Sequence, residues 1–206
     1  MNFASSKFLA LGILTITLPG LANESAIKAQ VTINVYNDAQ LSSQILAQAE
    51  KEATRIFRKA GVGSVWINCQ PLNAGIPPDA ECQQPVGPSH LALRIVPWSS
   101  ESGDAIFGVA FTSAADDGTY ADVFYNSAEK LHQECHAGVP KVLGHVIAHE
   151  IGHLLLGMNA HSLMGIMRPE WQGPELRSIG MGRLLFSSEQ ARSMQAKLFS
   201  VTARRR

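Results

Sequence analysis

The sequence has little charge and no excess of either sign. Of its 206 residues, 17% are charged, and 17 lysines and arginines balance 17 aspartates and glutamates. A neutral balance gives no electrostatic reason to expect nucleic acid or an anionic membrane surface as a partner. The chain also lacks internal repeats and low-complexity tracts, and 46% of its residues are hydrophobic. These features indicate an ordinary globular chain, large enough for one hydrophobic core.

The apolar stretch near the start is too short for a membrane span. It covers residues 8–18, whereas a spanning helix needs about 20 apolar residues. Lys7 precedes it and a small-x-small sequence at 20–22 follows, which is typical of a secretory signal. No cysteine follows that could carry a lipid anchor. We therefore expect a signal peptide over 1–22 and an exported protein, secreted or periplasmic, with no stable membrane anchor after cleavage near Asn23.

Cysteine is scarce, with three in the whole chain. Cys69 and Cys82 bracket a segment rich in proline and glycine, residues 71–78. In the oxidising compartment that export implies, such a pair favours a disulfide across the segment. Cys135 is the odd cysteine, and we expect it to be structural or unpaired.

The first elements follow from hydrophobic periodicity. Residues 31–36 alternate with a period of two, which predicts a strand. Apolar residues then recur at three- and four-residue spacing over 41–60, which predicts a helix that Asp38 could cap. A second strand is expected over 64–68. This β-helix-β order favours a parallel pair joined by a right-handed crossover.

Further strands are expected over 90–96, 106–111 and 121–125. A last helix should open at Ser187, because Ser187 and Gln190 have capping-box spacing ahead of an apolar face.

A mostly apolar helix is expected from Pro140 to Gly157, and it carries the main motif of the chain. His149 and His153 are four residues apart, so on a helix they project from one face and can reach a single metal ion. Glu150, next to the first histidine, can meet a water molecule at that metal. This H-E-x-x-H arrangement is typical of zinc peptidases, with the glutamate as general base. Metal ligation also explains polar side chains inside an otherwise apolar helix.

The residues after this helix carry a family resemblance. His161 is followed by Ser162, and then come Met167 and Pro169. This region resembles the metzincin clan of zinc endopeptidases, and within it the matrixins, whose third histidine ligand precedes a serine and a Met-turn. The resemblance implies that His161 is the third ligand of one catalytic Zn²⁺. It also implies that Met167 packs beneath the site without binding the metal.

The spacing to the third histidine departs from the family. His161 lies eight residues after His153, where the family has six, and Asn159 stands at the family's position. A longer active-site helix that ends at Gly157 would account for the difference. Asn159 is the alternative ligand, although its amide oxygen is a weak one for zinc.

The resemblance also implies a fold. We expect an α+β, zincin/metzincin-like domain over residues 23–206. A twisted mixed sheet, the crossover helix and the active-site helix would form an upper subdomain at about 31–157. A small lower subdomain, about 158–206, would end in a helix.

The same resemblance implies how substrate is bound. Gly108, Val109 and Ala110 match the family's edge strand above the cleft, where an extended peptide could pair. Pro169 and Trp171 match the wall of the pocket just beyond the scissile bond. The expected function is that of an exported zinc endopeptidase acting on proteins or peptides. Two alternatives remain: a zincin-fold binding protein without activity, and a structural zinc protein in which Cys135 or Asn159 supplies a fourth ligand.

Overall fold

The computed structural model describes residues 29–70, 79–98, 107–112, 118–157 and 159–204, and the expected signal peptide lies outside them. The elements are, in order, β1 (Ala29–Asn37), α1 (Ser43–Lys59), β2 (Val62–Cys69), β3 (His90–Val96), β4 (Gly108–Thr112), β5 (Gly118–Phe124), α2 (Tyr125–Glu134), α3 (Val139–Leu156), α4 (Gly173–Gly180) and α5 (Ser188–Arg204). No helix in the described ranges combines the length and apolarity that a membrane crossing requires.

The five strands form one mixed sheet in the order β2-β1-β3-β5-β4. Strand β1 pairs in parallel with both β2 and β3, and β5 is parallel to β3. Strand β4 alone runs antiparallel, on β5, and it forms one edge of the sheet. The expected α+β fold, with a mixed sheet and α1 as the crossover between parallel strands β1 and β2, is therefore confirmed.

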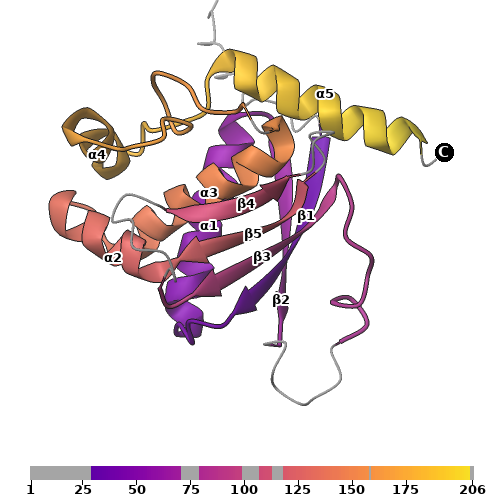
Figure 1. Cartoon of the computed structure of the whole chain (residues 1–206), viewed down its shortest axis with the longest axis horizontal. Helices are drawn as coiled ribbons and strands as arrows, with labels where there is room; N and C mark the ends of the chain where they lie inside the picture. Colours follow the sequence, from indigo (N-terminus) through magenta and orange to yellow (C-terminus); the bar gives the residue numbers. More distant parts are fainter. Residues whose placement is uncertain (1–28, 71–78, 99–106, 113–117, 158, 205–206) are drawn as a thin grey trace, which may run out of the picture.

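The hydrophobic core lies between the sheet and two helices. Alternate residues of β1, namely Val31, Ile33 and Val35, are buried, as the period-two pattern requires. Ile56 and Phe57 of α1 are fully buried as well. Figure 1 shows α1 and α3 behind the sheet and α5 across one end of it. The helices thus cover one face of the sheet and bring α3 alongside the antiparallel edge.

Helix α1 begins later than the sequence predicted. Ser42 is the N-cap, and its hydroxyl accepts a hydrogen bond from the Ile45 N–H at 3.3 Å. The expected cap at Asp38 is wrong because the chain first makes a turn that Asn37 stabilises. The Asn37 side chain accepts from the Leu41 N–H and donates to the Leu41 carbonyl.

Helix α3 is buried along most of its length, with Pro140 in its first turn and Gly157 after its last residue. The φ of Gly157 is 96°, a conformation that favours glycine and ends the helix. Gly144 allows close packing on α1, since a Cβ there would lie 2.7 Å from the Ala49 carbonyl oxygen. These glycines set the length of α3 and its distance from α1.

The chain beyond α3 forms α4 and α5. Helix α4 and the earlier α2 were not predicted from the sequence, because both are short and mostly polar. Helix α5 opens as expected: the Ser187 N–H donates to Gln190 Oε1, and the Gln190 N–H donates to Ser187 Oγ.

The structure pairs Cys69 with Cys82 across a sequence separation of 13. Cys82 also lies against β1, where its carbonyl accepts from the Asn34 side chain. Cys135 is buried and unpaired.

We predict that replacing Cys69 and Cys82 together by serine lowers the free energy of unfolding by about 3 kcal/mol, the loop-closure entropy of a short loop. Urea denaturation, with Cys135→Ser as the control that leaves the bond intact, measures the difference. An unchanged denaturation midpoint in the double variant would show that the bond does not stabilise the fold.

Candidate metal centre

Three histidines converge at the end of α3. His149, His153 and His161 each offer a ring nitrogen, and these atoms all lie within 4.8 Å of one another. Two of the rings come from successive turns of one helix, as their four-residue spacing dictates. The third comes from the segment that follows the helix. The structure therefore brings together the three side chains that the sequence predicted as ligands.

Hydrogen bonding fixes the orientation of the first ring. His149 is 2% exposed, and its Nδ1–H donates to the Ile166 carbonyl at 2.7 Å. Its Nε2 is therefore the free nitrogen, and it lies 3.1 Å from Nε2 of His153. A backbone acceptor on the distal nitrogen is the usual support of a metal-binding histidine.

The three rings are held in the neutral form that binds metal. Burial lowers the pKa of His149 to about 3 and that of His153 to about 4, and it lowers the pKa of His161 as well. At neutral pH each ring thus has a lone pair available without first losing a proton.

The spacing to His161 is explained by the path of the chain. Helix α3 continues through Leu156, and the chain turns at Gly157. The chain then returns, so that the ring nitrogen of His161 lies with those of His149 and His153. Of the two candidates for third ligand, His161 is the one that the structure places with the other two histidines.

Ser162 stabilises the loop that carries His161. The Ser162 N–H donates to the Met167 carbonyl at 2.9 Å, and its hydroxyl donates to the Met164 carbonyl at 2.8 Å. Gln190, from the first turn of α5, donates to the same hydroxyl. The loop is thereby tied to the last helix.

Glu150 is buried beside the histidines with one oxygen unsatisfied. It is 3% exposed, and its Oε1 has no hydrogen-bond partner among the described residues. Burial raises the pKa of its carboxyl group to about 8. Such an orphaned oxygen is costly and requires an explanation. A metal ion with water at the histidine group would provide both a partner and a counter-charge, so the residues fit a divalent cation.

Gly108 of β4 makes room for this carboxylate. A Cβ at Gly108 would lie 2.8 Å from Glu150 Cγ, closer than side chains tolerate. Val109 and Ala110 follow on the same strand, whose outer edge has no partner strand in the described sheet. The three edge-strand residues among those expected to bind substrate thus lie on the strand that contacts Glu150.

Met167 is fully buried against α3. Its Sδ would lie 2.7 Å from a Cβ at Gly152, so the absence of a side chain at Gly152 lets the thioether pack onto the helix between the two histidine positions. The segment expected to form a Met-turn therefore lies directly against the motif helix.

Trp171 and Pro169 differ in exposure. Pro169 is exposed, whereas Trp171 is buried and its indole N–H donates to the Ile166 carbonyl at 3.1 Å. The indole ring contacts Phe107, with 4.4 Å between ring centroids, and lies 5.7 Å from the His149 ring. Trp171 therefore supports His149, which sequence reasoning did not foresee.

A cavity of about 410 Å³ lies next to Trp171. Phe107, Glu170 and Gln172 line it together with residues of α2. Because the sequence did not predict α2, this cavity could not be anticipated.

The loop between His161 and Met167 carries two exposed apolar residues that the sequence did not single out. Leu163 is 93% exposed and Met164 is 73% exposed. Two adjacent apolar residues in a short loop are the sequence feature that could have revealed them.

Cys135, the alternative fourth ligand, is not a member of the histidine group. Burial raises the pKa of its thiol, which disfavours the thiolate that zinc requires.

Sequence comparison gives no relative, because no protein-family model and no curated protein sequence matches the chain. Comparison of folds does find similar solved structures. A zinc-dependent peptidase from Methanocorpusculum labreanum superposes with a TM-score of 0.50 at 15% identity, over 79% of this chain and 99% of the other. Metalloproteinase-II from Bacteroides fragilis gives a TM-score of 0.51 at 12% identity, over 86% of this chain and 55% of the other. At these identities the likeness shows the fold, which is zincin-like.

The assignment of His161 as the third ligand can be tested by substitution. We predict that His161→Ala lowers Zn²⁺ affinity by more than about 100-fold, since the loss of even an outer-shell partner costs about 10- to 100-fold. Asn159→Ala, two residues away and exposed, should leave the affinity unchanged. Competition with a chromogenic chelator measures both. The reverse ranking would contradict the placement of His161 at the metal.

Proposed function

We propose that the protein is a zinc-dependent peptidase. The observation that carries the proposal is a buried Glu150 oxygen without a partner among the described residues, on the helix that supplies two of three histidines whose ring nitrogens converge. A site for structural zinc would need a fourth protein ligand and no adjacent base. The fold neighbours, a zinc-dependent peptidase and a metalloproteinase, support the same reaction class.

His149, His153 and His161 would hold one Zn²⁺ through neutral imidazole nitrogens. When bound, zinc supplies a Lewis acid that polarises the scissile carbonyl and makes water a stronger nucleophile. Glu150 takes the proton from the attacking water and passes it to the leaving amine. The Ile166 carbonyl holds His149 in the tautomer that leaves Nε2 free, and the Trp171 indole N–H donates to the same oxygen.

The substrate is a protein or peptide bound in extended form. Strand β4 is an edge of the described sheet, and at Gly108, Val109 and Ala110 it offers backbone groups that can pair with such a chain. The side chain after the scissile bond would enter the cavity that Trp171 lines. We therefore propose an endopeptidase of the metzincin type, with Met167 packed against the helix that carries two of the histidines.

We further propose that the protein is exported after cleavage of residues 1–22, and that 23–206 is a single catalytic domain. The disulfide between Cys69 and Cys82 supports export, because such bonds persist in oxidising compartments. Helix α3 would end the upper subdomain, and the segment from 158 onward would form the lower one.

Glu150→Gln separates catalysis from binding. We predict that this variant retains stoichiometric zinc but loses hydrolysis of a quenched peptide by at least about 100-fold, because the amide cannot accept the proton. The matched control is Glu189→Gln, an exposed position in the first turn of α5 that lines neither the substrate cavity nor the histidine group. Undiminished turnover by the zinc-loaded Glu150→Gln variant would contradict the assignment of Glu150 as the general base. Inactivity of the wild-type zinc form on all peptides would favour a binding protein instead.

A further inference from the structure

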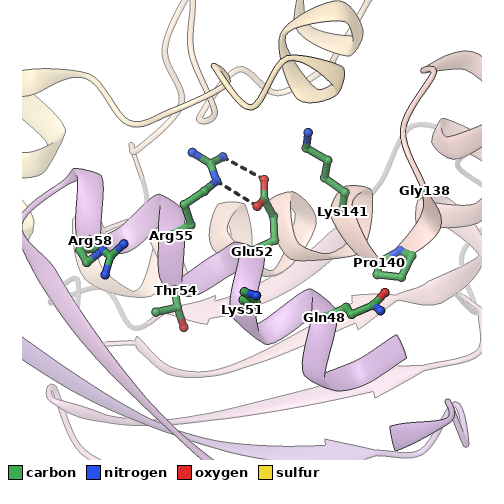
Figure 2. Close-up of a pocket in the computed structure, with 9 residues that line it drawn as sticks. All are labelled: Gln48, Lys51, Glu52, Thr54, Arg55, Arg58, Gly138, Pro140 and Lys141. Carbon is green, nitrogen blue, oxygen red and sulfur yellow. Dashed lines mark hydrogen bonds and ion pairs between the residues drawn. The ribbon is translucent and has the colours of Figure 1, made fainter. Parts of the chain in front are cut away.

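A second cavity lies on α1 and the first turn of α3. Its volume is about 650 Å³, and Figure 2 shows the side chains around it. The lining residues are Gln48, Lys51, Glu52, Thr54, Arg55, Arg58, Gly138, Pro140 and Lys141. Lys141 precedes His149 by eight residues, which is about 12 Å along a helix. The cavity is therefore separate from the histidine group.

The lining is strongly basic in a chain without net charge. Besides Arg58, its ionisable residues are the cations Lys51, Arg55 and Lys141 and one carboxylate, that of Glu52. Lys51 and Arg55 lie four residues apart on α1, a spacing that places them on one face of the helix. The third cation comes from α3. Packing of the two helices thus concentrates positive charge that neither helix carries alone.

The carboxylate is already occupied. Glu52 accepts hydrogen bonds from Arg55 Nε and Nη2, both at 2.9 Å, and this pairing leaves Nη1 of the guanidinium available. The Glu52 pKa is lowered through Arg55, His145 and Lys141, against the opposing effect of burial. The side chains of the cavity therefore present mainly hydrogen-bond donors.

Two of the cations are held close together. The Lys141 ammonium donates to the Gly180 carbonyl at 2.8 Å. A Cβ at Gly182 would lie 3.7 Å from the Arg55 guanidinium carbon and 3.9 Å from Lys141 Nζ. In Figure 2 these two side chains rise on either side of Glu52 toward the same rim. Both positive charges lie around the single Glu52 carboxylate, so a further anion would be attracted there.

We propose that this cavity binds a phosphate group. A set of donors with spare positive charge fits a multiply charged oxyanion better than a carboxylate, and Arg with Lys is a usual pair for phosphate. The side chains carry the site, because the first turn of α3 contributes little: Pro140 has no N–H, and the Lys141 N–H donates to the Gly138 carbonyl. The phosphate group could belong to a small soluble ligand or to a lipid headgroup.

The test uses the full chain and inorganic phosphate, titrated calorimetrically at constant ionic strength in chloride. Lys51→Ala and Lys141→Ala should each weaken phosphate binding by about tenfold, the effect of one charge-assisted hydrogen bond. Lys59→Ala is the matched control: it removes the same charge from an exposed position of α1 outside the cavity, and should change nothing. Circular dichroism checks that each variant is folded.

The outcomes distinguish the sources of the phosphate group. If inorganic phosphate binds and both cavity substitutions weaken it, the site accepts a free phosphate. If only vesicles of phosphatidylcholine with phosphatidylglycerol retain the protein, and the same substitutions abolish retention, the headgroup is the source. Phosphate binding that survives both substitutions would place the anion elsewhere, for example at the histidine group, and overturn the proposal. So would the absence of any binding to either probe, or binding of a glutamate-rich peptide alone.

Discussion

Helix α3 buries polar side chains that the fold alone does not satisfy, and the rest of the site depends on this constraint. Transferring a carboxylate or an imidazole from water into an apolar interior costs several kcal/mol unless a partner compensates. His149 finds one partner in the Ile166 carbonyl, but the Glu150 oxygen finds none among the described residues. A cation at the histidine group would offset that cost. Function and stability are thus coupled on one helix.

The segment after α3 is built to support this helix rather than to extend the core. The Ile166 carbonyl accepts from both His149 and Trp171, so one backbone oxygen positions the ligand and the ring behind it. Met167 packs at Gly152, where a side chain would displace it. Ser162 ties the loop of His161 to α5. The three candidate ligands therefore come from two segments, while contacts from a third hold them together.

The sequence predicted what depends on local spacing. The period-two strands, the helix with its paired histidines and the capping contacts at Ser187 all arise from neighbours within a few residues, and the structure contains them. The sequence failed where the outcome depends on competition or on distant segments. Asp38 and Ser42 are both suitable N-cap residues. The turn that Asn37 stabilises precedes the helix, so Ser42 is the N-cap. Helices α2 and α4 are too short and polar for periodicity to reveal. The contact of Trp171 with His149 and the basic cavity both join residues far apart in the chain.

In the proposed site, three imidazoles would hold the metal and leave a position open for chemistry. X-ray absorption spectroscopy at the zinc edge of the metal-loaded protein tests it most directly, because nitrogen and oxygen neighbours are distinguished from sulfur by distance, at about 2.0–2.1 Å against about 2.3 Å. The account predicts a first shell of light atoms alone, with the multiple-scattering signature of three imidazoles and one further light atom that the protein does not supply. A sulfur neighbour from Cys135 or Met167, or a fourth ligand from the protein, would contradict it.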